Sequence, residues 1–121
     1  MQSSSVEFSE IYFKGWGYED WLVNNGLYCG KILNFVTGCQ CSWHYHRIKD
    51  ETFYLLSGKL HVLYSWDDDI KTCNLVTLEP GMTFHVPVGL RHRMIAQTDA
   101  QLIEISTQHF EDDSIRIIPG D

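Results

Sequence analysis

From Leu27 onward the chain is a series of short apolar runs separated by turn-forming residues, and this pattern restricts it to an all-β fold. No window of twelve residues repeats apolar side chains at the 3.6-residue spacing of a long helix. Turn signals such as TGCQ, SGK, EPG and PVG lie between the runs. Seven or eight short strands in a chain of this length predict a β-sandwich or small barrel. The expected strands cover residues 27–36, 41–46, 51–56, 59–66, 72–78, 82–87, 92–97 and 101–106.

The 121 residues suffice for one ordinary domain. We expect residues 1–13 to form a polar N-terminal arm with a short strand in VEFSEIYF, and residues 14–121 to form a single domain. The glycines and acids of KGWGYEDW predict a loop. The run ETFYLLSGKLHVLYSW predicts a hairpin that turns at Ser57-Gly58. Three acids at Asp67–Asp69 predict a solvent-exposed turn, because no spaced series of calcium ligands follows them.

The charge balance excludes several classes of partner. The formal net charge is -7, whereas binding to nucleic acid or to an anionic membrane surface needs a basic face. No apolar run approaches the roughly 20 residues that a membrane span requires. The N-terminus, MQSSSVEFSE, has neither the basic start nor the apolar stretch of a secretory signal, so we expect a cytoplasmic protein.

The four cysteines form no C-x-x-C pair, and in a reducing compartment we expect them to be free thiols that fill small apolar spaces. A role of Cys39 and Cys41 as metal ligands remains an alternative, because they lie just before two histidines. The cysteines are Cys29, Cys39, Cys41 and Cys73.

Those two histidines and a glutamate lie close together in the stretch GCQCSWHYHRIKDETFYLLSG. Since side chains alternate between the faces of a strand, His44 and His46 share one face. Glu51 shares a face with Phe53, where a carboxylate is costly to bury unless it is paired or bound to metal. Two imidazoles and a carboxylate on adjoining strands suit a divalent first-row metal.

A fourth ligand is available in GMTFHVPVGLRHRMIA, where His92 opens the strand that follows a PVG turn. If this strand returns beside the first, His92 completes a site of three histidines and one glutamate. Catalytic metal sites of this kind keep an open position for water or substrate. The other histidines, His61, His85 and His109, occupy no ligand position in these two stretches and are expected outside the site.

The spacings of both stretches resemble the two signature motifs of the cupin superfamily. The first matches G-x5-H-x-H-x4-E-x6-G, and the second matches G-x5-P-x-G-x2-H, with Ala96 in place of the usual final asparagine. The resemblance implies a double-stranded β-helix, the jelly-roll cupin barrel. It also implies a divalent metal ion (Zn, Mn, Fe or Ni) bound by His44, His46, Glu51 and His92.

The flanking segments resemble the mannose-6-phosphate isomerase-like cupins, through KGWGYED, YCGKILNFVTGCQCSWHYHR and IEISTQHFEDDSIRI. This resemblance covers residues 14–116. The chain departs from the pattern of that group in two places. The gap between His46 and Glu51 is longer, and the last residues, IIPGD, lack the usual ending. In the closing segment the matching positions are Glu104, Asp112, Asp113 and Arg116.

This second resemblance implies a sugar or sugar-phosphate isomerase. The metal would polarise the carbonyl and hydroxyl oxygens and so lower the cost of the enediolate. A base must lie within about 3 Å of the carbon-bound proton, and Lys31 and Glu104 are the candidates, as polar residues within apolar strands. A phosphate would need nearby cations, which an acidic chain does not cluster, so an unphosphorylated sugar remains open. The available arginines are Arg47, Arg91, Arg93 and Arg116.

Two other functions remain open, because a fold alone does not define activity. One is a non-haem iron dioxygenase, since the same ligands bind iron. The other is a non-catalytic module that binds a small molecule or a sugar.

We also expect a homodimer, because several strands are apolar on both faces and the N-terminal arm could cover one sheet. The larger aromatic residues are expected in the core or in that interface. They are Trp43, Tyr45, Tyr54 and Tyr64.

Overall fold

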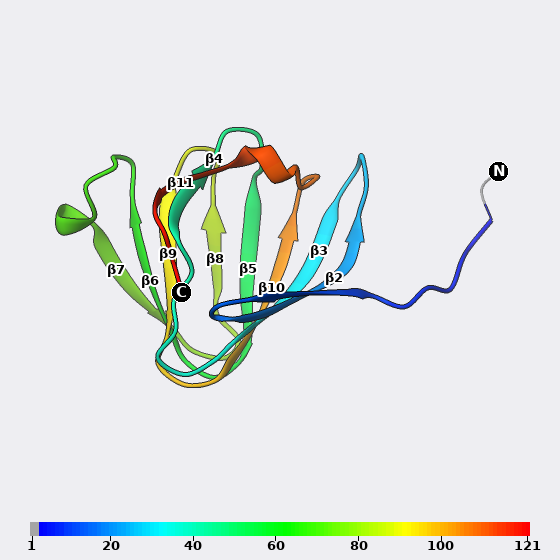
Figure 1. The fold of residues 1–121 in the computed structure, drawn as a ribbon, viewed down its shortest axis with the longest axis horizontal. Helices are drawn as coiled ribbons and strands as arrows, with labels where there is room; N and C mark the ends of the chain where they lie inside the picture. The colour runs from blue at the N-terminus through cyan, green and yellow to red at the C-terminus, as the bar shows by residue number, and fades with distance from the viewer. Residues whose placement is uncertain (1–2) are drawn as a thin grey trace.

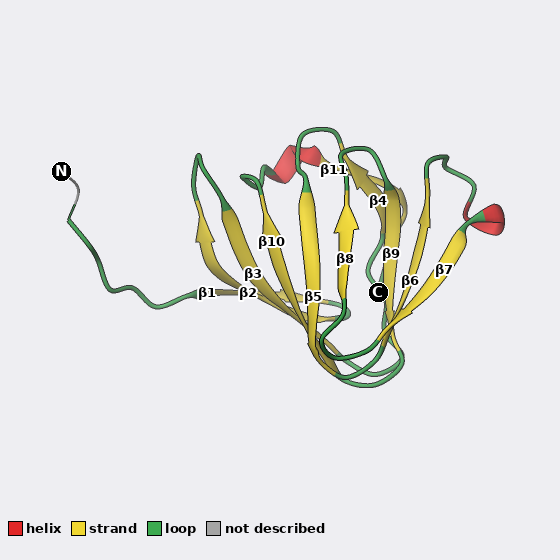
Figure 2. Ribbon diagram, turned by 180° about the vertical axis from the view of Figure 1, so that it is seen from behind, coloured by secondary structure: helices red, strands yellow, loops and turns green. Residues whose placement is uncertain are grey.

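Alternation of buried and exposed side chains organises the strands. In the computed structural model, which describes residues 3–121, β3 (Cys29–Phe35) and β10 (Ala100–Ser106) bury every second side chain. In β5 (Glu51–Ser57) the same alternation runs from its first residue to Leu55. Each of these strands therefore turns one face inward. The expected jelly roll is confirmed, because the strands form two antiparallel sheets that face each other (Figures 1 and 2).

One sheet has six strands in the order β1-β2-β3-β10-β5-β8, and the other has five in the order β11-β4-β9-β6-β7. Two single turns of 3-10 helix, η1 (Ile70–Thr72) and η2 (Glu111–Asp113), interrupt the connections. Within residues 3–121, no helix has the length and hydrophobicity that crossing a membrane demands. The remaining strands are β1 (Glu10–Lys14), β2 (Gly17–Asn24), β4 (Trp43–His46), β6 (Leu60–Ser65), β7 (Asn74–Leu78), β8 (Thr83–Val86), β9 (Arg91–Ala96) and β11 (Ser114–Ile118).

The hairpin predicted at Ser57-Gly58 is wrong. Strand β5 pairs with β10 and β8, whereas β6 pairs with β7 and β9, so the chain crosses from one sheet to the other at this point. Gly58 makes the crossing with a φ of 85°, and a Cβ there would overlap the carbonyl oxygen of Asp99. The turn residues mark a change of direction but do not specify which strands pair across it.

The loop predicted for KGWGYEDW is also wrong. Only Gly15 and Trp16 form a turn, and β2 begins at Gly17, so this segment is the β1–β2 hairpin. The acids that suggested a loop belong to a strand that pairs with β3 along its length. The chain also contains a strand that the apolar pattern did not predict, β11, which pairs with β4. In the expected N-terminal strand, regular structure begins only at Glu10; Met1 and Gln2 lie outside the described residues.

Several smaller predictions are confirmed. The four cysteines are free, and Cys29 and Cys41 are buried. The acids Asp67–Asp69 are exposed, and the carboxylate of Asp69 accepts a hydrogen bond from the backbone of Lys71 at the start of η1. The expected homodimer stays a prediction.

The space between the sheets divides into an apolar part and a polar part. Leu55, Leu60, Val62 and Leu102 are wholly buried in the apolar core. The β4–β5 loop and η2 lie together at the upper end of the molecule in Figures 1 and 2. The polar part is a cavity, and seven of the charged or imidazole residues that line it are at least nine-tenths buried. They are Lys31, His44, His46, Lys49, Glu51, His92 and Glu104.

Candidate metal centre

Three imidazoles converge from the five-stranded sheet. His44 on β4 pairs directly with His92 on β9, and His46 lies two residues further along β4 on the same inward face. One donor nitrogen from each ring lies within 4.8 Å of the other two. The structure therefore brings together the three histidines that the sequence predicted, from strands far apart in the chain.

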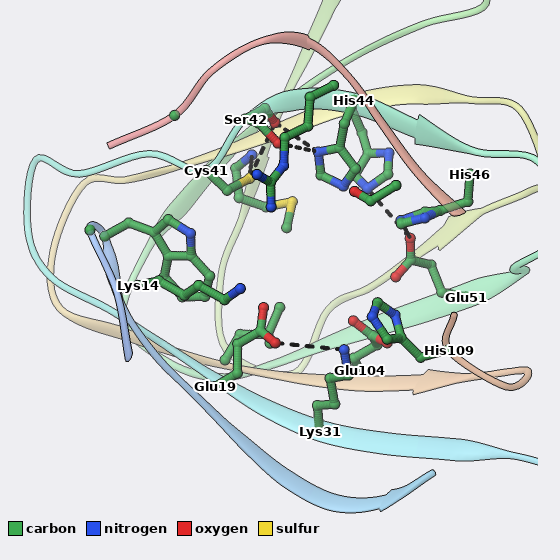
Figure 3. Close-up of a pocket in the computed structure, with 18 of the residues that line it drawn as sticks. Lys14, Glu19, Lys31, Cys41, Ser42, His44, His46, Glu51, Glu104 and His109 are labelled. Atoms are coloured by element: carbon green, nitrogen blue, oxygen red, sulfur yellow. Dashed lines mark hydrogen bonds and ion pairs between the residues drawn. The ribbon is translucent and has the colours of Figure 1, made fainter. Parts of the chain in front are cut away.

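Glu51 reaches the imidazoles from the opposite sheet. Its Oε2 lies 3.2 Å from Nε2 of His46 (Figure 3). The same oxygen lies 3.4 Å from Nε2 of His92. The sequence placed Glu51 on a strand adjoining that of His44 and His46. In the structure β5 instead faces β4 across the interior, and the candidate centre links the two sheets.

The ring orientation of each histidine is set by a backbone carbonyl. A carbonyl can only accept, so Nδ1 of each ring must carry the hydrogen and Nε2 must present a lone pair to the centre. This tautomer is the one that metal ligation through Nε2 requires. The distances from Nδ1 of His44, His46 and His92 to the carbonyl oxygens of Ser42, Asp113 and Leu90 are 2.9, 3.0 and 3.0 Å.

Two atoms of the centre are buried without a hydrogen-bond partner: Oε2 of Glu51 and Nε2 of His92. Given the tautomer above, these atoms face each other with lone pairs, an arrangement that is unfavourable unless a cation lies between them. Three neutral nitrogen donors and one carboxylate oxygen suit a divalent first-row ion. The residues present therefore fit the expected metal.

The protonation states agree with this fit. Burial, together with the neighbouring His92 and His46, holds the pKa of His44 well below its ordinary value. Burial alone would raise the pKa of Glu51, but the nearby Lys49 ammonium group outweighs burial and holds it well below its ordinary value. His44 is thus neutral and Glu51 ionised near pH 7, as ligands must be.

Both residues predicted as catalytic lie in the same cavity as the histidines. The cavity has a volume of about 440 Å³, and Figure 3 shows several of the residues that line it. Glu104 on β10 is the cross-strand partner of Lys31 on β3, and both point inward. The ammonium group of Lys31 lies 3.6 Å from Oε1 of Glu19 and 4.0 Å from the centre of the Trp21 ring. The catalytic roles of Lys31 and Glu104 stay predictions.

Lys49 is a cavity residue that the sequence reasoning missed. Its side chain is 3% exposed, and Nζ lies 3.0 Å from Oε2 of Glu104 and 3.6 Å from Oε1 of Glu51. The sequence did contain a signal, because residue 49 precedes Glu51 by two and therefore shares its face if the strand is extended backward. Lys49 links the candidate metal ligand to the candidate base.

The charges of Lys49 and Glu104, which form a buried ion pair, depend on the residues around them. Burial lowers the pKa of Lys49, but Glu51 and Glu104 outweigh burial and raise it above its ordinary value. Burial and the charge of Glu51 raise the pKa of Glu104, although Lys49 and Lys31 oppose the rise. Lys49 is therefore an ammonium ion, while Glu104 is a more basic carboxylate than an exposed one, as proton transfer near neutral pH favours.

The expectation that His109 lies outside the site is wrong. Nδ1 of His109 lies 3.2 Å from Nζ of Lys49, and the ring lines the cavity. Burial and the nearby Lys31 and Lys49 lower the pKa of His109 to about 3. The neutral ring can therefore accept a hydrogen bond from Lys49. Two hydrogen bonds between its backbone and the side-chain amide of Asn24 hold His109 in this position, and no local pattern in the sequence indicates them.

The structure separates the four arginines proposed for phosphate binding. Arg116 lines the cavity. Arg91 pairs with Asp68 at 2.8 Å. Arg93 is buried against backbone carbonyl groups, to which it donates. Arg47 is exposed and is not among the cavity residues. The cavity therefore has a single guanidinium group.

Replacing Lys49 with methionine is expected to lower the free energy of unfolding by about 3–5 kcal/mol, because it leaves buried carboxylates without their counter-ion. Urea denaturation of the metal-free variant measures this loss. The exposed Lys71, replaced in the same way, serves as control and should change stability by no more than about 0.5 kcal/mol. The double variant Lys49→Met/Glu104→Gln should recover part of the loss. Equal, small effects at both lysines would contradict the pairing.

Comparisons with known proteins bear on the fold. A family model described as cupin domain matches residues 32–106. No curated protein sequence matches the chain. A solved structure of the capsular polysaccharide assembling protein CapF from Staphylococcus aureus is similar, with a TM-score of 0.78 and 17% identity over 91% of this chain and 34% of CapF.

Two further solved structures are similar. Oxalate decarboxylase from Bacillus subtilis gives a TM-score of 0.78 and 14% identity, over 96% of this chain and 33% of that protein. KdgF from Halomonas sp. gives a TM-score of 0.73 and 16% identity, over 89% of this chain and 98% of KdgF. The chain thus spans about a third of the length of CapF and of oxalate decarboxylase. At these identities the likeness shows the fold alone.

Proposed function

The chain belongs to the cupin family, and from this premise we propose that it is a metal-dependent isomerase that interconverts an aldose and a ketose. One observation carries the proposal: the Glu104 carboxylate is 96% buried inside the cavity that the three histidines line. Isomerisation needs a cation for the substrate oxygens and a base for the carbon-bound proton. The proposal is supported by one small cavity that is lined by candidate groups for both requirements.

A divalent ion bound by the histidines and Glu51 would supply the positive charge that stabilises the substrate oxygens as the proton leaves. Glu104 takes the proton from one carbon and returns it to the next. Lys49 keeps the Glu104 carboxylate in place through its 3.0 Å hydrogen bond. Lys31 and Glu19 provide a donor and an acceptor for the hydroxyl groups of an open-chain sugar.

The charges around the cavity favour a neutral, unphosphorylated sugar as the substrate. Four basic and five acidic side chains line it, so the side chains by themselves provide no excess of positive charge for a phosphate, and the divalent ion would be engaged with the sugar oxygens. A volume of about 440 Å³ lies within the usual range of roughly 300–1,000 Å³ for small-molecule sites. The basic residues are Lys14, Lys31, Lys49 and Arg116, and the acidic ones are Glu19, Glu51, Glu104, Glu111 and Asp121.

The proposal is tested by hydrogen exchange from solvent. The purified protein is loaded in turn with Zn²⁺, Mn²⁺, Fe²⁺ and Ni²⁺ and incubated with a panel of pentoses and hexoses in deuterated water. We expect one sugar to gain deuterium at the carbon next to its carbonyl group and to yield the paired ketose, as followed by proton NMR. Absence of exchange with every sugar and metal would exclude isomerase activity on these sugars. Oxygen consumption by the iron-loaded protein would favour an oxygenase instead.

A further inference from the structure

The carboxylate of Asp113 is bound by three consecutive backbone N–H groups of the loop that joins β4 to β5. Arg47 donates to Oδ1 at 2.8 Å, Ile48 donates to Oδ1 at 3.1 Å, and Lys49 donates to Oδ2 at 3.0 Å. Asp113 is 5% exposed. A buried carboxylate that accepts from successive amides forms a set of charge-assisted hydrogen bonds, which are stronger than neutral ones.

The same residue also contacts a candidate metal ligand. The backbone carbonyl of Asp113 accepts the hydrogen bond from Nδ1 of His46 at 3.0 Å. Next to it, Ser114 begins β11 as the cross-strand partner of His46. Asp113 therefore binds the end of β4 through its backbone and the following loop through its side chain.

This loop is short, and it determines where two cavity residues, Lys49 and Glu51, lie relative to His46. It begins directly after His46, contains Lys49 and ends at Glu51, the first residue of β5. A shift of the loop backbone would move Glu51 relative to His46 and Lys49 relative to Glu104. The side chain of Asp113 does not itself reach the centre, so any effect on the centre must pass through the loop.

We propose that Asp113 is a positioning residue that sets the geometry of the metal centre and of Lys49 by fixing the backbone of residues 47–49. The inference rests on the proposed metal-dependent function. Replacement of the carboxylate by an amide removes the negative charge and turns an N–H group toward the loop amides. The ligands of the centre remain present, but their spacing is no longer fixed.

The test compares Asp113→Asn with Asp112→Asn, a matched control at the neighbouring exposed acid. The probe is Co²⁺ alone, with affinity measured by titration and ligand geometry by visible absorption. Asp113→Asn should weaken Co²⁺ binding about 10- to 100-fold, as changes outside the ligand shell do. It should also alter the absorption bands, whereas Asp112→Asn should change neither.

Circular dichroism of the metal-free variants first establishes that they fold. If Asp113→Asn does not fold, Asp113→Ser, which keeps one small acceptor, takes its place; failure of both to fold would overturn the inference in favour of a role in folding alone. A folded variant with unchanged affinity and spectrum would overturn the inference and leave the proposed function intact. Absence of Co²⁺ binding by the unaltered protein would instead overturn the metal centre itself.

Discussion

Replacing His92 with glutamine is expected to weaken the binding of a divalent ion by about 100-fold. The free energy of zinc binding to structural sites is about 10–16 kcal/mol for four ligands, or roughly 3 kcal/mol for each ligand. His92 is fully buried and its Nε2 has no hydrogen-bond partner, so its replacement removes one nitrogen donor from the proposed ligand set. Isothermal titration with Zn²⁺ or Mn²⁺ measures the change.

Thermal unfolding gives an independent readout of the same variant. A metal at 1,000 times its Kd stabilises a protein by about 4 kcal/mol, and a 100-fold weaker site leaves about 1.4 kcal/mol at that concentration. The metal-induced rise in Tm should therefore fall to about a third. The exposed His85, replaced by glutamine, serves as control and should keep the full rise. Equal metal responses in the two variants would rule out His92 as a ligand.

Replacing Glu104 with glutamine is expected to slow the isomerisation about 10²- to 10⁴-fold while leaving metal affinity within a few-fold of its original value. The loss is of the size typical for a positioned general base. Metal binding should persist because Glu104 contacts Lys49 and Ser106 and none of the proposed ligands. The rate of deuterium uptake and a metal titration, measured on the same preparation, separate these two effects.

Glu79→Gln, at an exposed position outside the cavity, is the control for charge removal and should exchange at the original rate. A parallel loss of metal affinity and rate in Glu104→Gln would show that Glu104 supports the centre and is not the base. An unchanged rate of deuterium uptake would mean that another cavity residue is the base, and Lys31 would be the first to test.

The clustering of the three histidines could be predicted in part because one piece of it depends on a local rule. Side chains that are two residues apart on a strand share a face, and this rule predicted that His44 and His46 lie side by side. The turn before His92 indicated where the next inward-facing histidine would begin a strand. The resemblance to the cupin motifs, and not a local rule, joined His92 to the other two, and the structure brings all three rings together.

The partition of the strands between sheets could not be predicted in the same way. Ser57-Gly58 is suited to a hairpin and to a crossing between sheets, and only contacts with distant residues decide between them. The lining of the cavity depends on equally distant contacts. Lys49 contacts Glu104, which lies 55 residues later in the chain, and His109, which lies 60 residues later. No short window of sequence therefore contains either pair.

The pairing of β3 with β10, which places Phe35 opposite Ala100, has a consequence for the kinetics of folding. Loop-closure entropy must be lost before such remote partners meet, and all-β proteins with high contact order fold in milliseconds to seconds. His44 and His92 meet only when β4 and β9 have found each other. We therefore expect a cation to bind after the rate-limiting step of folding and to act chiefly by slowing unfolding.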